Sequence, residues 1–350
     1  MNITSKQFKV AVVGLGHWGP NLIKAFLNDH RISEVIGVEV DPKRYQFISK
    51  EYPQLSLLND LDICLKDPSI EAIVIATPTE THYALGLKCL EANKHLFIEK
   101  PLSHSYETAR HLVDLAKEKQ KILMTGHIFL YNQAVQKMKE LVENGELGDI
   151  LHIKSIRANL GPVRHDVNAL WDLAAHDISI FDYIFERVPL QVSCRAFSLL
   201  GLEQQDIAVG TLEYSFNKSA TFLVSWIDPV KTRQITIIGS KKMLVFDDMQ
   251  PNTPLTVYDK SILVSKNQFA LKSGTLNQAD CVHSIELHVG DSYLLPITKT
   301  EPLKEECRDF VDCILSGSSP RSDGENGLRI ISQLEALVRS YSQFGALINL

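Results

Sequence analysis

The chain has 350 residues, and its 36 basic and 42 acidic side chains give a formal net charge of −6 at pH 7. A hydrophobic content of 45% is ordinary for a globular protein, which excludes wholesale disorder. The mild acidity argues against a nucleic-acid-binding protein, which would present a basic face. No apolar run approaches the roughly 20 residues that cross a bilayer, and the length favours about two domains.

The N-terminal residues and the cysteines indicate the cellular compartment. Met1–Lys9 is polar and lacks the apolar segment of a secretion signal. The six cysteines form no CxxC pair and have no histidine at zinc-ligand spacing, so no metal site is expected. Because scattered cysteines of this kind are typical of buried, reduced thiols, we expect a soluble cytoplasmic protein that binds neither membrane nor nucleic acid.

The first third of the chain alternates short apolar runs with helical patterns. Helical patterns cover Thr81–Asn93 and Ser105–Lys119. Continuous apolar runs suit parallel strands that are buried on both faces. The alternation predicts an α/β domain with a doubly wound parallel sheet, bounded at residues 1–127. Its expected strands are Lys9–Leu15, Glu34–Val40, Ala72–Ala76, His95–Ile98 and Ile122–Thr125.

The remainder, residues 128–350, has a different pattern. Two pairs of strands joined by short turns are expected at residues 207–227 and 234–246, and Gln250–Ser292 is interpreted as loops with short strands. We expect a long strand at Ile150–Leu160, and helices at Asn132–Asn144, Trp171–Phe185, Glu305–Leu315 and Gly327–Ser342.

This second pattern predicts an α+β domain with a large, mostly antiparallel open sheet. Such a sheet usually has one face covered by helices and the other face free. The free face favours a homodimer or homotetramer through the open sheet. The pattern leaves open whether the C-terminal helices pack back on the first domain.

A glycine-rich loop follows the first expected strand. Gly14, Gly16 and Gly19 form a GxGxxG motif that encloses His17 and Trp18 and opens a helical pattern. The first glycine permits a tight turn, the second lets a pyrophosphate approach the backbone, and the third lets helix and strand pack closely. Because a helix N-terminus also offers free N–H groups, the motif predicts a Rossmann domain that binds a dinucleotide.

The acidic residue that accompanies this motif is present. Glu39 ends the second expected strand, twenty positions after Gly19. Its carboxylate can accept hydrogen bonds from the ribose hydroxyls of the adenosine and would repel a 2′-phosphate, which favours NAD over NADP. Lys43 and Arg44 stand close by and leave NADP open as the less favoured cofactor.

Ligands of such sheets bind beyond the carboxyl ends of the strands. The third expected strand is followed by Thr77, Pro78, Thr79 and His82, and the fourth by Glu99 and Lys100. A lysine at such a position can polarise a carbinol or carbonyl oxygen. We therefore add these six residues to the glycine-loop residues and Glu39 as candidate cofactor ligands.

The segments VVGLGHWG, ATPTETHY and EKPL occur in this order and spacing. They resemble the glucose–fructose oxidoreductase / inositol dehydrogenase / rhizopine-catabolism (Gfo/Idh/MocA) family, and WDLAAHD resembles the family's catalytic helix. The resemblance implies a Rossmann domain followed by an α/β domain, a nicotinamide cofactor, sugar-like substrates and a cis bond between Lys100 and Pro101. By matching positions it implies Lys100, Asp172 and His176 as the catalytic set.

The spacing of two of these residues supports their pairing independently. Asp172 and His176 are four positions apart on an expected helix and share one face. In the reversible oxidation of a secondary alcohol, His176 would accept the hydroxyl proton and Lys100 would stabilise alkoxide character. Asp172 would orient the imidazole, hold the lysine charged or contact a sugar hydroxyl. Which of the lysine and the histidine transfers the proton stays open.

The substrate must be inferred from the residues around this helix. Arginines suit phosphates or carboxylates, and amides suit sugar hydroxyls. The segment RxNxGxxRxDVNxxWDLxxHD resembles family members that oxidise nucleotide sugars, often at C3 of a UDP-N-acetylhexosamine or its uronic acid. Alternatives are a sugar sensor without catalysis, an inositol or free-sugar dehydrogenase, and an NAD-dependent glycoside-cleaving enzyme. The candidate substrate ligands are His127, Tyr131, Asn159, Arg164, Asn168 and Trp171.

Overall fold

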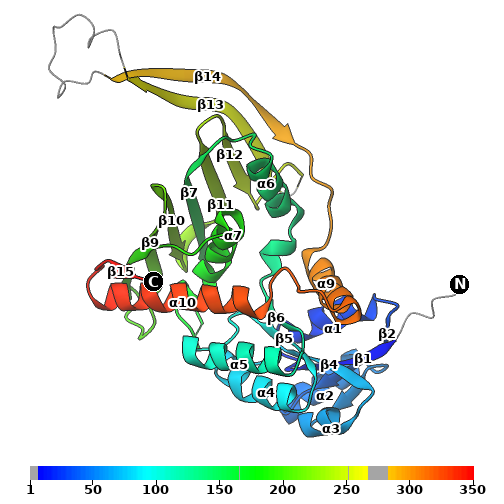
Figure 1. Cartoon of the computed structure of the whole chain (residues 1–350). Coiled ribbons are helices and arrows are strands. Elements are labelled where there is room, and N and C mark those ends of the chain that lie inside the picture. Colours follow the sequence, from blue (N-terminus) through cyan, green and yellow to red (C-terminus); the bar gives the residue numbers. More distant parts are fainter. Residues whose placement is uncertain (1–6, 165, 251, 267–282) are drawn as a thin grey trace, which may run out of the picture.

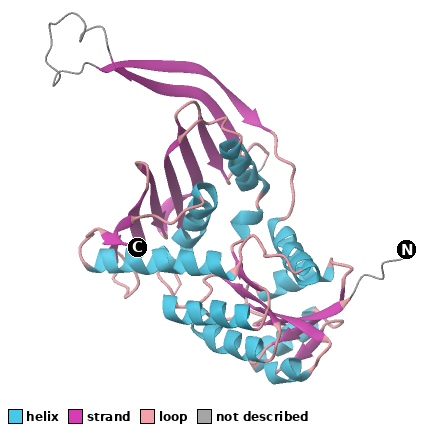
Figure 2. Ribbon diagram, in the orientation of Figure 1, coloured by secondary structure: helices cyan, strands magenta, loops and turns pink. Residues whose placement is uncertain are grey.

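The computed structural model describes residues 7–164, 166–250, 252–266 and 283–350, which form two sheets with their helices (Figures 1 and 2). No helix in these ranges is long and apolar enough to span a membrane. The five cysteines within them are buried and unpaired, as the sequence predicts.

The first sheet has six parallel strands in the order β3-β2-β1-β4-β5-β6, which confirms the doubly wound prediction. The sequence analysis missed β3, which has only three residues and is only partly buried. The strands are β1 (Phe8–Val13), β2 (Ile32–Val38), β3 (Ser56–Leu58), β4 (Ile70–Ile75), β5 (His95–Glu99) and β6 (Leu123–Gly126). The connecting helices are α1 (Gly19–Leu27), α2 (Pro42–Glu51), α3 (Leu61–Lys66), α4 (Thr79–Glu91) and α5 (Tyr106–Glu118).

Burial on both faces explains the continuous apolar runs. In β1, Val10 and Val12 belong to one buried cluster, whereas Ala11 and Val13 belong to the cluster on the opposite face. Because successive side chains of a strand point to opposite faces, neither set of positions tolerates polar residues. The peptide bond between Lys100 and Pro101, directly after β5, is cis, as the family resemblance implies.

The second sheet has nine strands in the order β14-β13-β12-β11-β7-β10-β9-β8-β15. Only β7 and β10 pair in parallel, so the sheet is mostly antiparallel, as predicted. The strands are β7 (Ile150–Leu160), β8 (Gln191–Phe197), β9 (Ile207–Tyr214), β10 (Lys218–Ser225), β11 (Ile227–Gly239), β12 (Met243–Asp247), β13 (Leu255–Lys266), β14 (His283–Leu295) and β15 (Ile348–Asn349).

Helices cover one face of this sheet and leave the other open. Apolar residues of α6, α7 and α10 form one buried cluster with alternate residues of the strands, for example Ile235 and Ile237 of β11. The helical segments of this half are η1 (Ile128–Tyr131), α6 (Gln133–Glu143), η2 (Leu170–Ala174), α7 (Ala175–Phe185), α9 (Pro302–Ser316) and α10 (Gly324–Ser342).

The expectation of loops with short strands over Gln250–Ser292 is wrong. β13 and β14 are long, paired strands, and Figure 1 shows them extending beyond the rest of the sheet. Ile262, Leu263 and Val264 are consecutive apolar residues, so this part of β13 does not show the strict alternation of apolar and polar residues that indicates a half-buried strand. Residues 267–282 lie outside the described part.

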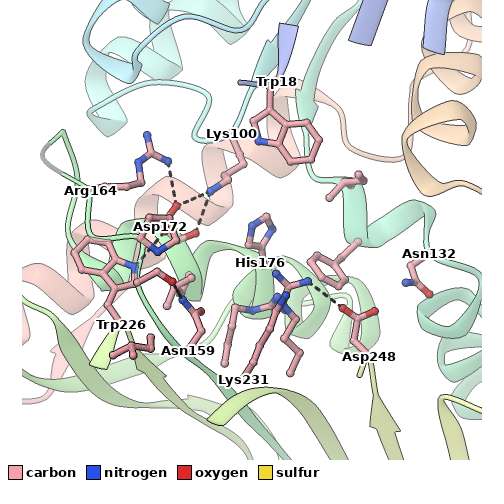
Figure 3. A pocket seen from close by; sticks show the side chains of 18 of the residues that line it. Trp18, Lys100, Asn132, Asn159, Arg164, Asp172, His176, Trp226, Lys231 and Asp248 are labelled. Carbon is pink, nitrogen blue, oxygen red and sulfur yellow. Dashed lines mark hydrogen bonds and ion pairs between the residues drawn. The ribbon is translucent and has the colours of Figure 1, made fainter. Parts of the chain in front are cut away.

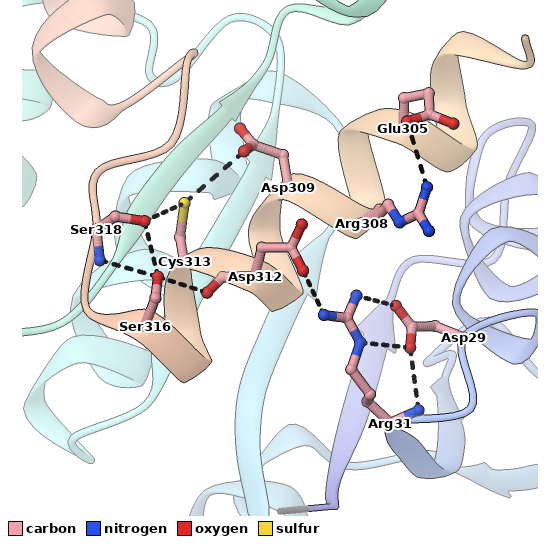
Figure 4. A network of polar contacts seen from close by, with 9 residues as sticks. All are labelled: Asp29, Arg31, Glu305, Arg308, Asp309, Asp312, Cys313, Ser316 and Ser318. Carbon is pink, nitrogen blue, oxygen red and sulfur yellow. Dashed lines mark hydrogen bonds and ion pairs between the residues drawn. The ribbon is translucent and has the colours of Figure 1, made fainter. Parts of the chain in front are cut away.

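Helix α9 follows β14 in the chain, but it packs on the first domain rather than on the second sheet. The Phe310 ring lies 6.4 Å from that of Phe26 and 5.7 Å from that of Phe97, between centroids. Arg31 donates to Asp29 and to Asp312 of α9, which ties the helix to the loop before β2 (Figure 4). Residues near the C-terminus therefore help to fix the first domain.

Candidate active site

A first cavity of about 900 Å³ lies beyond the carboxyl ends of the parallel strands. Its lining includes every predicted cofactor ligand except Gly19 and His82. These lining residues are Gly14, Gly16, His17, Trp18, Glu39, Thr77, Pro78, Thr79, Glu99 and Lys100.

The glycine loop has the geometry that a pyrophosphate needs. Gly14 has a φ of +87°, and a Cβ there would lie 2.6 Å from Thr77. A Cβ on Gly19 would lie 2.2 Å from the carbonyl oxygen of Gly14, so helix and loop pack without space for a side chain. A Cβ on Gly16 would meet nothing within 4 Å. Since Gly16 lines the cavity, its backbone is open to a ligand and the site fits a dinucleotide.

Glu39 holds the same loop in place. One carboxylate oxygen accepts a hydrogen bond of 2.8 Å from the Leu15 N–H, and the other accepts one of 2.9 Å from the Asp41 N–H. Each oxygen retains further acceptor capacity for a ribose hydroxyl. Arg44 donates to the carbonyl oxygens of Leu15 and Gly16, so it fixes the loop from the other side.

His82, predicted as a cofactor ligand, lies behind the lining of the first cavity. It is 1% exposed, and its ring nitrogens lie 2.8 Å from the Pro101 carbonyl and 2.9 Å from the Thr77 carbonyl. Burial lowers the pKa of this histidine, although its two carbonyl partners act in the opposite direction. The His82 ring therefore connects the loop after β4 to the loop after β5, and both loops contribute residues to the cavity lining.

A second cavity of about 830 Å³ adjoins the first (Figure 3). Trp18, Lys100 and Arg164 line both cavities, so a ligand in one would meet a ligand in the other at these side chains. The second sheet and its helices supply Phe129, Asn132, Arg157, Asn159, Asp172, His176, Trp226, Lys231, Arg233 and Asp248.

Lys100 and Asp172 meet where the two cavities join. The lysine Nζ lies 3.1 Å from Oδ1 of the aspartate and 3.0 Å from its backbone carbonyl oxygen. Arg164 donates to the same Oδ1 at 3.0 Å, and Trp226 donates to Oδ2 at 3.3 Å. Burial alone would raise the pKa of Asp172, but the lysine and the arginine outweigh it and hold that pKa below its usual value.

The expected helix over Trp171–Phe185 begins with a π-helical turn, η2, and is α-helical from Ala175. Such turns are rare and occur often at functional sites. Asp172 lies in the π-helical turn and His176 lies one residue into the α-helix. Both side chains line the second cavity.

His176 lies in a positively charged environment. Its ring packs edge-on against Phe129, with centroids 5.2 Å apart. Burial lowers the pKa of the imidazole well below its usual value, and the nearby Lys100 and Arg157 lower it further. Arg157 itself forms a buried ion pair of 2.9 Å with Asp177. The His176 imidazole is therefore neutral at pH 7, and its Nδ1 has no hydrogen-bond partner in the described part of the chain.

The predicted substrate ligands fall into two groups. Asn159 and Arg164 line the second cavity. His127 and Tyr131 are each 1% exposed and are not among the residues that line it. Burial lowers the pKa of His127 to about 3, and the Tyr131 hydroxyl donates to Asp309 of α9 at 2.7 Å. Both residues are therefore buried beneath the cavity lining and pack in the interior.

Asn168 and Trp171, the other two predicted substrate ligands, line a third, smaller cavity of about 370 Å³. The Asn168 amide donates to Gln205 at 2.9 Å and accepts from the Trp171 N–H at 3.0 Å. Trp171 packs against the cores of both domains. Their side chains therefore stabilise the start of the helix that carries Asp172.

Several lining residues were missed by the sequence analysis. In the pairing of β11 with β7, Ile227 lies opposite Leu160 and Thr232 lies opposite Ala158. The extra residues of β11 between these two pairs form a bulge. Bulges often redirect side chains next to active sites, and Lys231, in this bulge, lines the second cavity. A bulge depends on pairing between distant strands, so no local signal would have identified it.

The cations of the second cavity are mostly neutralised by carboxylates. Arg233 pairs with Asp248 at 3.3 Å, Lys100 and Arg164 pair with Asp172, and Arg157 pairs with Asp177. No carboxylate in the described ranges forms an ion pair with Lys231. Those ranges also contain no cluster of His, Cys, Asp or Glu side chains that could hold a metal ion.

Comparison with protein families identifies the chain. Residues 8–127 match the oxidoreductase family model with an NAD-binding Rossmann fold, and residues 135–245 match the Gfo/Idh/MocA C-terminal domain. The protein belongs to the Gfo/Idh/MocA oxidoreductase family. Its N-terminal domain is an NAD-binding Rossmann domain, as the sequence analysis predicted.

Individual relatives agree with this assignment. The chain is 25% identical to the myo-inositol 2-dehydrogenase of Thermotoga maritima, over 91% of this chain and 92% of that protein. It is 31% identical to the 2,7-anhydro-N-acetylneuraminate hydratase of Escherichia coli, over 40% of this chain. The chain spans only 37–40% of the length of that hydratase and three other curated relatives that it matches.

A solved structure shows the same fold over nearly the whole chain. The UDP-N-acetylglucosamine 3-dehydrogenase of Acidithiobacillus ferrooxidans superimposes with a TM-score of 0.78 and 20% identity, over 97% of this chain and 99% of that one.

Proposed function

We propose that this protein catalyses the NAD-dependent, reversible oxidation of a secondary hydroxyl to a ketone on a sugar or nucleotide sugar. The observation that carries the proposal is the junction of the two cavities. Lys100 lines both of them, is paired with Asp172, and faces the space that His176 lines. A dinucleotide in the first cavity and a sugar in the second would meet at these groups.

When bound, NAD⁺ supplies a hydride acceptor for the hydrogen on the carbinol carbon. Lys100 would donate a hydrogen bond to the substrate oxygen as the hydroxyl acquires alkoxide character. The adjacent Asp172 carboxylate and backbone carbonyl accept hydrogen bonds of 3.1 Å and 3.0 Å from the lysine amine and so orient it. Arg164 and Trp226 hold that carboxylate in place, so the amine is oriented before substrate arrives.

His176 would accept the hydroxyl proton and return it in the reverse direction. A general base must be unprotonated at the working pH, and burial together with Lys100 and Arg157 keeps this imidazole neutral. This division of roles assigns proton transfer to His176 and charge stabilisation to Lys100.

The lining of the second cavity favours an anionic sugar derivative. Lys231 has no carboxylate partner among the described residues, and Arg233 lies two positions further along the same strand. Arginine and lysine suit phosphate and carboxylate groups. A UDP-N-acetylhexosamine oxidised at C3, or its uronic acid, meets this requirement, and the dehydrogenase from Acidithiobacillus ferrooxidans has a name consistent with it.

The test is the formation of NADH, followed at 340 nm, with a panel of substrates. The panel contains myo-inositol, N-acetylglucosamine, N-acetylglucosamine 1-phosphate, UDP-N-acetylglucosamine and its uronic acid, each with NAD⁺ and with NADP⁺. We expect turnover with NAD⁺ and one of the anionic sugars. Binding of NADH without turnover of any panel member would favour a sensor and contradict the proposal. Release of a leaving group without net NADH would favour glycoside cleavage.

A further inference from the structure

Two acidic side chains lie between the first sheet and helix α9, next to the residue at which the two cavities join. Glu99 ends β5 and lines the first cavity, and its carboxyl accepts a hydrogen bond of 3.2 Å from the Lys100 N–H. Glu306 of α9 is 0% exposed, and both of its carboxyl oxygens lack a hydrogen-bond partner among the described residues. Because buried polar groups almost always have partners, this carboxyl requires an explanation.

The packing of α9 on β5 brings the two carboxyls together. The Phe97 and Phe310 rings are in contact, with centroids 5.7 Å apart. Glu99 lies two residues beyond Phe97 on the same face of the strand. Glu306 lies one turn before Phe310 on the same face of the helix. Pro302, at the start of α9, lines the second cavity at the carboxyl end of β5, so strand and helix run in opposite directions and the two carboxyls are neighbours.

The groups around this pair are mostly neutral. Gly126 of β6 lies opposite Glu99, and a Cβ there would lie 2.8 Å from Oε2 of that carboxyl, which therefore fills the space of a side chain. Burial lowers the pKa of His127, the next residue, to about 3. Burial also raises the pKa values of the Tyr131 hydroxyl and the Cys307 thiol. None of these neighbours supplies a positive charge that would stabilise an ionised carboxyl.

The surroundings favour the protonated form of both carboxyls. Burial raises the pKa of Glu99 to about 7, although Lys100 acts in the opposite direction. Burial, followed by the nearby Glu99 and Asp309, raises the pKa of Glu306 well above its usual value. Two adjacent buried carboxyls do not both ionise at neutral pH. Glu306 therefore keeps its proton, whereas Glu99 gains and loses one near pH 7.

Glu99 also lies at the nicotinamide end of the cofactor cavity. The adenosine ribose is expected at Glu39 after β2, and the pyrophosphate at the glycine loop after β1. β4 and β5 come next in the sheet, so the other end of the dinucleotide reaches Glu99 and Lys100. The nicotinamide ring carries a positive charge in NAD⁺ and none in NADH. Glu99 is placed to respond to that difference.

We propose that Glu99, next to a permanently protonated Glu306, responds to the oxidation state of the cofactor by releasing a proton when NAD⁺ binds and keeping it when NADH binds. The carboxyl O–H bond breaks, the proton leaves for solvent through the cavity, and no bond of the cofactor changes. A carboxylate then faces the positive ring, and a neutral acid faces the neutral ring. Rising pH therefore favours bound NAD⁺, and falling pH favours bound NADH. This linkage belongs to cofactor binding and needs no substrate.

The direct test counts protons. Calorimetric titration with NAD⁺ and with NADH at pH 7, in two buffers of different ionisation enthalpy, gives the number released. The ring charge should weaken the proton affinity of Glu99 about tenfold, so we expect release of about 0.4 proton with NAD⁺ and none with NADH. Groups near the pyrophosphate, such as His17, meet the same charge in both forms, so the difference between the two counts excludes them. From pH 6 to pH 8, the affinity for NAD⁺ relative to NADH should rise about fivefold.

Two variants and a control locate the proton. Glu99→Gln should abolish the difference between the two counts. Glu306→Gln should preserve it and leave the melting temperature at pH 7 nearly unchanged, because an amide replaces a neutral acid of the same shape. Glu305→Gln, the neighbouring and partly exposed position of α9, is the control. Infrared spectra at pH 8 should contain the carbonyl band of a protonated carboxyl group that is absent in Glu306→Gln.

Equal proton counts for NAD⁺ and NADH in the wild type would overturn the proposal, as would a difference that persists in Glu99→Gln. If Glu99→Gln does not fold or bind the cofactor, the wild-type counts and the pH dependence of the affinity ratio decide. A large rise in the melting temperature of Glu306→Gln, or an unchanged infrared band, would show that Glu306 is ionised and contradict its assigned role.

Discussion

The two adjoining cavities are built in different ways. The first is lined mainly by residues at or just after the carboxyl ends of β1, β2, β4 and β5, all within the first 100 residues apart from Arg164 and Asp166. The second takes its polar groups from β7, η2, α7 and β11 and from the loops that adjoin them. A cofactor site built from a local backbone motif can be predicted from the sequence. A substrate site built from side chains that lie far apart in the sequence cannot be predicted in this way. The expected effects of substitutions should differ accordingly.

The largest expected effect lies at the junction of the two cavities. Lys100→Ala should lower kcat by about 1,000-fold or more, because it removes the positive charge next to the developing alkoxide. NADH affinity, measured by fluorescence titration, should stay within about threefold, because the backbone holds most of the cofactor. Lys119→Ala, on the surface after α5, is the control. Full activity in the Lys100 variant would remove this residue from the catalytic set.

The next effect separates two glycines of the first cavity. Gly16→Ala should weaken NAD binding by about 100-fold and leave the melting temperature nearly unchanged, because its Cβ meets only the open cavity. Gly19→Ala should weaken binding and also destabilise the fold by about 2–4 kcal/mol, since its Cβ would lie 2.2 Å from a carbonyl oxygen. Calorimetry with NAD titration measures both quantities. Equal melting temperatures in the two variants would contradict this assignment.

A smaller effect should be confined to the second cavity. Lys231→Met should raise KM for an anionic substrate by about 10- to 30-fold, with kcat nearly unchanged and KM for a neutral sugar unaffected. Lys218→Met, at the start of β10 and outside the cavity, is the matched control. If both variants show the same kinetics, Lys231 does not recognise the substrate.

The smallest effect is a shift in the pH profile. His176 must be neutral to accept a proton, and its pKa is lowered by burial and then by Lys100 and Arg157. Activity in the oxidation direction should therefore persist below pH 6.5 and fall only as the pH passes the lowered value. Arg233→Met removes one nearby cation and should move the acidic limb of kcat/KM upward by a few tenths of a unit. An acidic limb above pH 6.5 in the wild type would assign the proton transfer elsewhere.

The same contrast explains what the sequence could predict. The glycine loop, Glu39 and Lys100 were identified because each follows a strand at a fixed offset from an apolar run. Asp172 and His176 were identified from the family motif. Their positions depend little on the remainder of the fold.

Residues whose surroundings depend on contacts with distant parts of the chain were harder to predict from the sequence. Tyr131 was placed among substrate ligands, but its hydroxyl reaches Asp309, 178 positions away. Trp226 and Lys231 line the second cavity because β10 and β11 flank β7 in the sheet, which no periodicity within one segment reveals. The length of β13 and β14 was missed because their apolar residues do not alternate strictly with polar ones, as at Ile262, Leu263 and Val264.

The central claim is that one substrate hydroxyl contacts both Lys100 and His176 beside the nicotinamide. A crystal structure of the protein with NADH and the substrate found in the panel tests it most directly. We expect the substrate oxygen within hydrogen-bonding distance, about 2.6–3.2 Å, of the lysine Nζ and of a ring nitrogen of His176. A sugar bound outside the second cavity, or one whose reacting oxygen contacts neither group, would contradict the account.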